Sequence, residues 1–199
     1  MIDTASLATT FTAGLPDWVL PFVTAYHGPT STSEERMALV HALADRNFVA
    51  GNGGPFAAVV ADPETGEIVS VGVNVVLSSG LSSAHAEVTA ISLAQVAMRS
   101  WDLAAVRPGL ELVVNWRPCA MCLGAVLWSG VQRLVVAGDG PDLERLTGFD
   151  EGPVVADWAD QLHLRGIEIE QDVLREGAIA TYTAYGQSQS LVYNARRGE

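Results

Sequence analysis

The spacing of hydrophobic residues along the chain predicts a first helix that begins near residue 32. Thr32 followed by Glu35 has the spacing of a capping box, and apolar residues then recur at helical intervals up to about Phe48. Residues 1–32 are rich in Thr, Pro and aromatic residues without a sustained period, so we expect an N-terminal arm or a short helix there. The rest of the chain, residues 33–199, is expected to form one domain.

Short apolar runs separated by turn residues predict strands that alternate with helices. The expected strands are 56–61, 67–76, 110–115, 132–137 and 167–170, and the expected later helices are 84–98, 119–128 and 173–185, with a polar loop over 78–83. Such alternation favours an α/β fold in which a mixed sheet lies between two layers of helices, a three-layer α/β/α arrangement.

Composition narrows the class of partner. The formal net charge is −12, and the 11 Lys and Arg residues form no basic run. Because phosphate neutralisation by Lys and Arg supplies most non-specific affinity for nucleic acid, a polynucleotide partner is not expected, and a small neutral substrate is. The sequence shows neither the pattern of a signal peptide nor an apolar stretch of membrane-spanning length, so we expect a cytoplasmic protein without a membrane partner.

Two short motifs carry the candidate chemistry. The run His85-Ala86-Glu87 lies in the first turn of one predicted helix, and the run Pro118-Cys119-Ala120-Met121-Cys122 opens another. These runs match the H-x-E and P-C-x-x-C signature of zinc deaminases. Two thiolates three residues apart share a helix face, and a histidine from a neighbouring helix start completes three corners of a tetrahedron. We therefore predict a zinc site formed by His85, Cys119 and Cys122, with the fourth position open for water.

Glu87 is the expected proton carrier of this site, because it lies two residues from the predicted histidine ligand. Two other interpretations of the cysteines are a redox-active thiol pair and a structural zinc site. A structural site would need a fourth protein ligand, and His27, His41 and His163 show no ligand spacing to the cysteines. The sequence therefore favours a catalytic zinc.

Four further runs make the chain similar to a known family. The runs 54–60 (GPFAAVV), 84–91 (AHAEVTAI), 121–125 (MCLGA) and 148–153 (GFDEGP) resemble bacterial guanine deaminases of the cytidine-deaminase fold, as does the closing run Tyr193-Asn194-Ala195-Arg196. The resemblance spans residues 35 to 198 approximately. It implies zinc-dependent hydrolysis of the 2-amino group of guanine to give xanthine and ammonia. It also implies a homodimer in which the C-terminal segment is exchanged and covers the partner's site.

The resemblance also implies roles for residues outside the metal motif. Asn74 would bind the edge of the base, Phe56 would form a wall against its ring, and Asp150 would contact the substrate. Glu151 would act as a second catalytic carboxylate near the amine. The residues alone leave alternatives open, since Asn74 is equally suited to a turn bonded to its own backbone and residues 150–151 to a solvated loop.

The chain departs from this family directly before the Pro-Cys pair. The family usually has a glutamate there, whereas this chain has Trp116 and Arg117. A single charged side chain is most often at the surface, so we expect Arg117 to point into solvent. A charge reversal beside the metal could still alter the pocket. Other substrates therefore stay open, namely a triazine such as ammeline, guanosine, cytidine, a pterin or a specialised metabolite.

Overall fold

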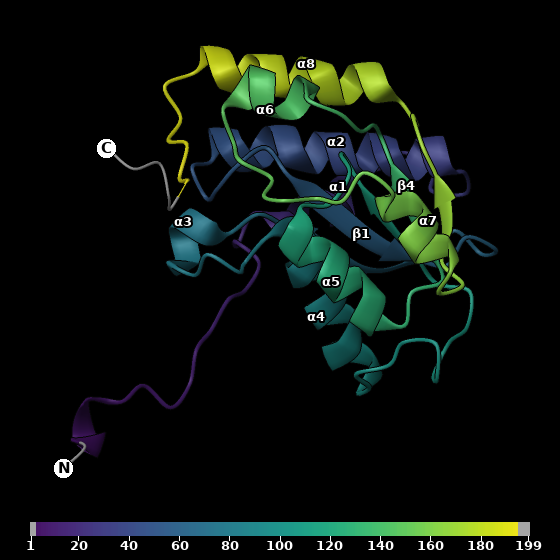
Figure 1. Cartoon of the computed structure of the whole chain (residues 1–199), viewed down its shortest axis with the longest axis horizontal. Helices are drawn as coiled ribbons and strands as arrows, with labels where there is room; N and C mark the ends of the chain where they lie inside the picture. The colour runs from purple at the N-terminus through teal and green to yellow at the C-terminus, as the bar shows by residue number, and fades with distance from the viewer. Residues whose placement is uncertain (1–2, 195–199) are drawn as a thin grey trace.

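A single mixed sheet of five strands runs through the computed structural model, which describes residues 3–194 (Figure 1). The strands are β1 (Ala57–Ala61), β2 (Ile68–Val73), β3 (Glu111–Val114), β4 (Arg133–Val136) and β5 (Glu168–Glu170), in the spatial order β2-β1-β3-β4-β5. Strand β1 pairs antiparallel with β2 and β3, whereas β3, β4 and β5 run parallel. The predicted α/β fold with a mixed sheet is thereby confirmed.

Helices cover both faces of the sheet. In the described part of the chain they are α1 (Val19–Ala25), α2 (Ser33–Val49), α3 (Val76–Ser79), α4 (Ala86–Met98), α5 (Ala120–Ser129), α6 (Asp142–Thr147), α7 (Trp158–His163) and α8 (Arg175–Gln187). Figure 1 shows α2, α6 and α8 on one side of the sheet and α4 and α5 on the other. None of the helices in residues 3–194 combines the length and the apolar character that crossing a bilayer requires.

The side chains of the strands alternate between two hydrophobic cores. Val59 and Val113 lie in the core that contains the buried residues of α2 and α8. Leu112 and Leu134 lie in the opposite core, with buried residues of α4, α5 and α7. Because both faces are covered, the central strands β1, β3 and β4 are largely apolar, as expected for a sheet buried between helices.

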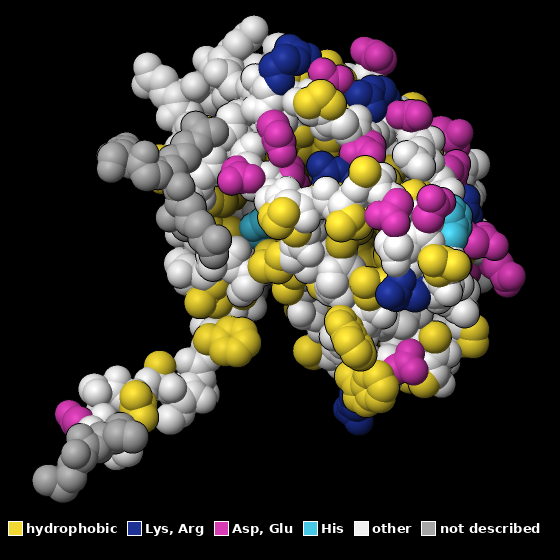
Figure 2. All heavy atoms as spheres, viewed as in Figure 1, with side chains coloured by type: hydrophobic (Ala, Val, Ile, Leu, Met, Phe, Trp, Pro, Cys, Tyr) yellow, Lys and Arg dark blue, Asp and Glu magenta, His cyan; other side chains and the backbone are white. Residues whose placement is uncertain are grey.

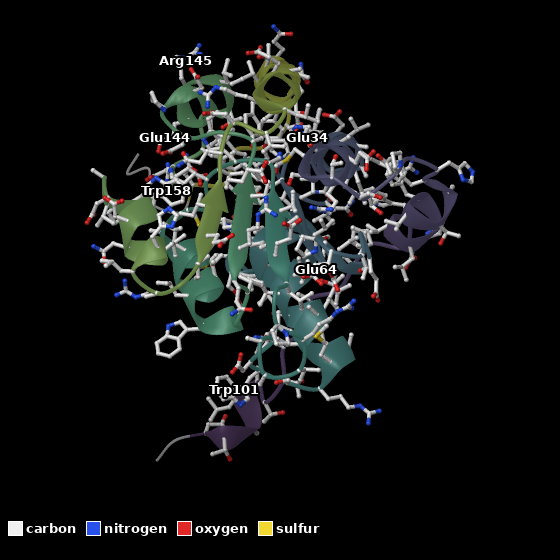
Figure 3. All side chains as sticks on the ribbon, turned by 90° about the vertical axis from the view of Figure 1, so that its right-hand side faces the viewer. Glu34, Glu64, Trp101, Glu144, Arg145 and Trp158 are labelled. Carbon is white, nitrogen blue, oxygen red and sulfur yellow. The ribbon has the colours of Figure 1, made fainter. Side chains whose placement is uncertain are left out.

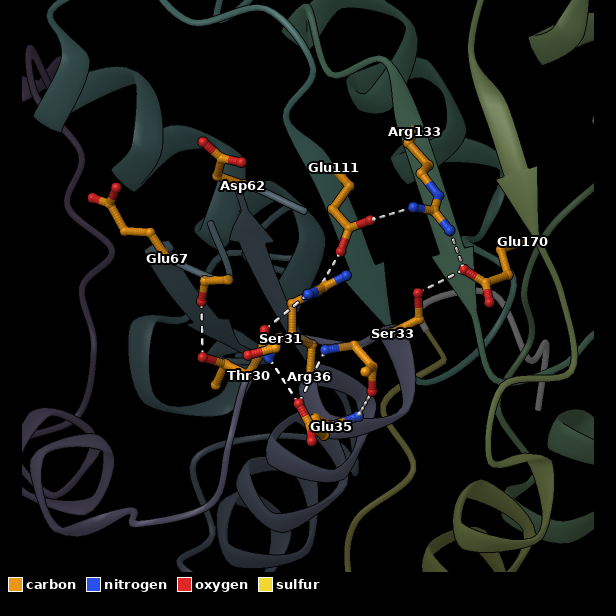
Figure 4. A network of polar contacts seen from close by, with 12 residues as sticks. Thr30, Ser31, Ser33, Glu35, Arg36, Asp62, Glu67, Glu111, Arg133 and Glu170 are labelled. Atoms are coloured by element: carbon orange, nitrogen blue, oxygen red, sulfur yellow. Dashed lines mark hydrogen bonds and ion pairs between the residues drawn. The ribbon is translucent and has the colours of Figure 1, made fainter. Parts of the chain in front are cut away.

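An ion-pair network fixes the start of α2 against the sheet (Figure 4). The Nε of Arg36 donates to Oε1 of Glu111 at 2.5 Å, and both side chains are buried. The guanidinium of Arg133 lies between the carboxylates of Glu111 and Glu170, and Ser33 donates to Glu170 at 2.7 Å. Burial raises the pKa of Glu111 against the opposing influence of the two arginines. Removing one partner would leave a buried charge unpaired, so this network holds α2, β3, β4 and β5 together.

The N-terminal residues include both exposed and packed segments. Residues 3–14 are exposed and extend away from the body of the molecule (Figure 1), whereas Val19 of α1 is buried in the core beside α2. Helix α2 begins as predicted, because Thr32 accepts a hydrogen bond from the Glu35 amide and the Glu35 carboxylate accepts one from the Thr32 amide.

The structure differs from the predicted elements in three places. The strand expected to reach residue 76 ends at Val73, because Oδ1 of Asn74 accepts the N–H of Val76 at 3.2 Å and turns the chain into α3. The short helix α3 therefore replaces part of the expected loop. Helices α6 and α7 were not predicted, because six residues are too few for a helical period to be recognised.

Candidate functional site

The N-termini of α4 and α5 bring the three predicted metal ligands together. His85 is the N-cap of α4, Cys119 is the N-cap of α5, and Cys122 follows in the first turn of α5. Nδ1 of His85 lies 3.6 Å from the Sγ of each cysteine, and the three donor atoms lie within 4.8 Å of one another. Within residues 3–194, no other group of three or more His, Cys, Asp or Glu residues is arranged to hold a metal ion.

Close packing of α4 on β2 places His85. A Cβ atom at Gly72 would lie under 3.0 Å from the carbonyl oxygen of Ala86 and from the backbone nitrogen of Ala90, so a larger residue at Gly72 would push α4 away. Ser70 adds a hydrogen bond from its hydroxyl to the Ala90 carbonyl at 2.7 Å. The position of the histidine at the start of α4 therefore depends on a glycine in the neighbouring strand.

The donor set fits a zinc ion. Tetrahedral zinc with Zn–S distances of about 2.3 Å and Zn–N distances of about 2.0–2.1 Å places nitrogen and sulfur roughly 3.6 Å apart. This is the separation between Nδ1 of His85 and each Sγ. One nitrogen and two sulfur donors, with no fourth protein ligand among the described residues, form the pattern of a catalytic zinc site rather than a structural one.

Of the three donors, Cys119 has the ionisation that suits a cation, whereas a hydrogen bond with Cys119 and burial raise the pKa of Cys122. The hydrogen bond with Cys122, assisted by His85, outweighs burial and lowers the pKa of Cys119 to about 4. Burial lowers the pKa of His85, but its bond to Cys119 and the charges of Glu87 and Glu151 outweigh burial and raise it to about 9. The helix N-termini add partial positive charge that favours thiolates. Metal binding would therefore release the protons that His85 and Cys122 carry.

Two carboxyl groups lie beside the metal ligands. Burial, followed by the negative charge of Cys119, raises the pKa of Glu87 in the first turn of α4. The same two causes, together with the charge of Glu87, raise the pKa of Glu151 to about 8. The backbone carbonyl of Glu151 also accepts the N–H of Ala120 at 3.1 Å, which fixes its loop to the start of α5. Two carboxyls with raised pKa values in one place are suited to proton transfer near neutral pH.

A cavity of about 780 Å³ contains this chemistry. Figure 2 shows the face seen in Figure 1, with acidic side chains over its upper part and hydrophobic ones over its lower part, where α4 and α5 lie. Cys122 is buried beside the cavity, and the structure brings all the other predicted site residues to its wall: Phe56, Asn74, His85, Glu87, Cys119, Asp150 and Glu151. The roles of these residues stay predictions.

The amide of Asn74 is held in one orientation. Its Oδ1 accepts hydrogen bonds from the Tyr193 hydroxyl at 2.7 Å and from the Val76 N–H at 3.2 Å. The Tyr193 hydroxyl itself accepts the N–H of Gly54 at 2.8 Å. Nδ2 of Asn74 has no hydrogen-bond partner in the described chain, so the amide offers donors to the cavity that it lines. Asn74 therefore bonds to nearby backbone and also faces the candidate site.

The segment around Tyr193 closes one side of the cavity. The Tyr193 ring packs edge-on against Phe149 at 4.9 Å between centroids. Asn194 donates to the Gly148 carbonyl at 2.8 Å and accepts the N–H of Asp150 at 3.1 Å. The sequence indicated Tyr193 only as part of the closing run that resembles the family. A tyrosine joins a hydroxyl group to an aromatic ring, which suits a ligand-binding site, and this was the signal that could have identified it. Exchange of this segment between subunits stays a prediction.

The prediction that Arg117 points into solvent was wrong. Only 8% of Arg117 is exposed, and it lines the cavity. Its Nε donates to Oδ1 of Asp139 at 2.5 Å, and Oδ2 of Asp139 accepts the indole N–H of Trp158 at 2.9 Å. These partners lie later in the chain, so the residues adjacent to Arg117 in the sequence gave no sign that the half-buried carboxylate of Asp139 would hold it.

Comparisons with known proteins agree with this geometry. Residues 30–138 match the family model of the cytidine and deoxycytidylate deaminase zinc-binding region. A guanine deaminase of Bacillus subtilis is 34% identical over 134 residues, which are 67% of this chain and 81% of the relative. The solved structure of a guanine deaminase from Nitrosomonas europaea has a TM-score of 0.84 at 38% identity, over 92% of this chain and 99% of that one. Another solved structure, of a protein in complex with 2,6-diaminopurine, has a TM-score of 0.82 at 40% identity, over 92% and 96% of the two chains.

Proposed function

Because the chain belongs to the cytidine and deoxycytidylate deaminase zinc-binding family, we propose that it is a zinc-dependent aminohydrolase that converts guanine to xanthine and ammonia. One observation carries the proposal: three metal donors and the carboxyl groups of Glu87 and Glu151 meet at one cavity. Its similarity to guanine deaminases over most of the chain supports guanine as the substrate.

We assign the metal to His85, Cys119 and Cys122. When bound by these residues, zinc would supply a water molecule of lowered pKa. The buried carboxyl group of Glu87, whose pKa is raised, would take a proton from this water and deliver it to a ring nitrogen of the base. Addition of water at the amino carbon and departure of ammonia balance the reaction.

Glu151 and the aromatic wall are assigned supporting roles. The pKa of Glu151, raised to about 8, suits a second acid that protonates the departing amine while Glu87 carries the other proton transfers. Phe56 lies edge-on to Phe149 with centroids 5.4 Å apart, and both line the cavity where a flat heterocycle would pack. Asp150 lines the same wall and would contact the substrate.

The orientation of Asn74 supports a base whose edge offers hydrogen-bond acceptors. Guanine has such acceptors in its oxo group and its ring nitrogens, and the Nδ2 group of Asn74 supplies only donors. Other amino-heterocycles that share an acceptor edge, such as ammeline, remain the alternative within the same chemistry. A thiol redox role has less support, because both cysteines lie with His85 in an arrangement that fits a metal ion.

A homodimer in the cytoplasm is part of the same proposal. Large apolar side chains, among them Met121 and Trp128, are exposed on α5, and a second copy of the chain would cover them. The proposed substrate is a small molecule, and neither a polynucleotide nor a membrane is required for the reaction.

A substrate panel tests the proposal. Zinc-loaded protein is incubated with guanine, guanosine, ammeline, cytosine and cytidine, and ammonia release and product absorbance are followed. We expect turnover of guanine to xanthine. The matched variant Glu87→Gln should keep zinc and fold but lose activity by about 10²- to 10⁴-fold, since it removes general acid-base catalysis. Turnover of cytidine without turnover of guanine would contradict the substrate, and full activity in metal-free protein would contradict the zinc site.

A further inference from the structure

Arg117 is a cationic group in the cavity wall that the proposed reaction does not use. Among the lining residues within 3–194 there is no other lysine or arginine. The side chain is more than nine-tenths buried, and the residue directly precedes the Pro118-Cys119 pair that begins the metal-binding turn. A buried charge is costly without partners, so either the fold or a ligand must provide partners for the Arg117 guanidinium.

The fold fixes one edge of the Arg117 guanidinium. Nε donates to Oδ1 of Asp139 at 2.5 Å, and the same oxygen accepts the N–H of Gly140 at 2.5 Å. Oδ2 of Asp139 accepts the indole N–H of Trp158, which projects from α7 (Figure 3). The backbone N–H of Arg117 also donates to the Gly138 carbonyl at 2.8 Å. Because both oxygens of Asp139 are bonded to fixed groups, the guanidinium has little freedom to rotate.

The other edge of the guanidinium keeps donors for a ligand. A guanidinium carries five N–H donors and no acceptor. Nε is bonded to Asp139, and Nη1 has one long contact of 3.4 Å with the Pro118 carbonyl. The remaining three N–H groups, on Nη1 and Nη2, have no protein partner in the described residues. Since an unpaired donor of a charged group is costly when water is excluded, a ligand that fills the cavity must bring an acceptor to this edge.

The charges in the cavity decide which acceptor fits. Asp139 already offsets the charge of Arg117, and Glu87, Asp150 and Glu151 line the same cavity. A ligand with a phosphate or carboxylate would find the one guanidinium of the lining already paired with Asp139 and would lie beside the acidic side chain of Asp150, so a neutral acceptor is favoured. A carbonyl-type oxo group provides such an acceptor, whereas an exocyclic amino group would place donors against donors.

From these contacts we propose that Arg117 is a specificity residue: together with Asn74, it makes the cavity select heterocycles that carry a neutral oxo group over those with an amino group in its place. This inference rests on the proposed function only in placing the base in this cavity. It assigns to Arg117 a contact with the oxo group of the substrate, while the amino group that is removed faces Glu87 and Glu151.

Two pairs of purines test the inference, since each pair exchanges an oxo group at position 6 for an amino group and, with it, the N1–H donor for an N1 acceptor. Binding of hypoxanthine and adenine to zinc-loaded protein is measured by calorimetry, and kcat/KM is compared for guanine and 2,6-diaminopurine. The wild type should favour the oxo member of both pairs. Arg117→Met should weaken binding of hypoxanthine and lower kcat/KM for guanine by about tenfold to a hundredfold, the typical effect of losing a hydrogen bond to a charged group, with little change for the amino members.

Control variants separate specificity from folding. Arg145→Met removes an arginine that is 65% exposed on the outer side of α6 and pairs with Asp142 (Figure 3), so it should change neither ratio. Arg117→Lys keeps a cation for Asp139 but not the planar fork, so it should lose much of the oxo preference with zinc content and thermal midpoint unchanged. If Arg117→Met does not fold, Arg117→Lys alone tests whether Arg117 determines the preference for oxo purines.

Two results would contradict the role of Arg117, and a third would contradict the proposed function alone. Equal losses for oxo and amino purines in the Arg117 variants would show that the residue is only a structural clamp. Wild-type protein that binds hypoxanthine no more tightly than adenine would also contradict the role of Arg117. If the wild type turns over neither guanine nor 2,6-diaminopurine, the proposed function fails, while the binding comparison still decides the role of Arg117.

Discussion

The Tyr193 hydroxyl helps to fix the orientation of the Asn74 side-chain amide, which an asparagine side chain alone does not fix. A free amide can present either its oxygen or its NH2 group to a ligand, because the two differ by a rotation of the side chain. The Tyr193 hydroxyl and the Val76 N–H both bond the oxygen, so the NH2 group is left for the cavity. One phenol in the C-terminal segment thus decides which edge of a base the pocket can bind.

Replacing Tyr193 by phenylalanine tests this residue-scale device. Tyr193→Phe removes the hydroxyl and keeps the ring against Phe149, so the Asn74 amide can rotate. We expect kcat/KM for guanine to fall by about two- to tenfold, the range of one neutral hydrogen bond, mostly through a higher KM. Steady-state kinetics measures both constants. Tyr26→Phe is the matched control, because Tyr26 lies outside the cavity, and a similar loss in both variants would contradict the proposed role.

At the scale of single residues, sequence analysis found the groups that lie in short motifs. His85, Cys119 and Cys122 were recognisable because each motif occupies one helix start. The burial of Arg117 was not, because it depends on Asp139 and Trp158, which the sheet topology brings to it from later elements. A local pattern contains no information about partners of that kind.

Among the elements, the contact between α4 and β2 has the most direct effect on the site. Gly72→Ala would place a methyl group under 3.0 Å from the backbone of Ala86 and Ala90, which are held by the helix. We expect a loss of about 1–3 kcal/mol in the free energy of unfolding, the usual cost of overpacking, and weaker zinc binding because His85 begins α4. Urea unfolding and zinc competition with a chelator measure these two effects.

Gly124→Ala is the control for this element. Gly124 lies inside α5, and a Cβ there would meet no atom within 4 Å. Alanine should stabilise the helix by up to about 1 kcal/mol and leave zinc binding unchanged, since glycine has the weaker helix propensity. If both variants had the same stability and zinc affinity as the wild type, close packing of α4 on β2 would not be what positions His85.

Element prediction succeeded where a helix had a clear start or a long period. The capping box of Thr32 and Glu35 located the start of α2 to the residue. The end of β2 was missed because a single side-chain bond, from Val76 to Asn74, overrides the β propensity of a valine-rich run. Such side-chain bonds and helices of two turns or fewer are decided by tertiary contacts rather than by hydrophobic spacing.

For the molecule as a whole, the net charge of −12 leads to a prediction about partners. A labelled single-stranded oligonucleotide should show no saturable binding in fluorescence anisotropy at physiological salt, because few Lys and Arg residues are available to displace counterions. The control is the same titration at low salt. Binding that saturates at micromolar protein and weakens as salt rises would contradict this prediction and favour a nucleic-acid substrate.

The hydrogen bond between Tyr193 and Asn74 joins residues 119 positions apart in the chain. The metal donors, in contrast, all come from α4 and α5, which pack against each other. A refolding chain should therefore gain its affinity for zinc before its affinity for a purine, because contacts between distant segments form late. A metal-sensitive dye and a fluorescent purine, followed in the same stopped-flow experiment, would report the times at which the zinc site and the purine site form.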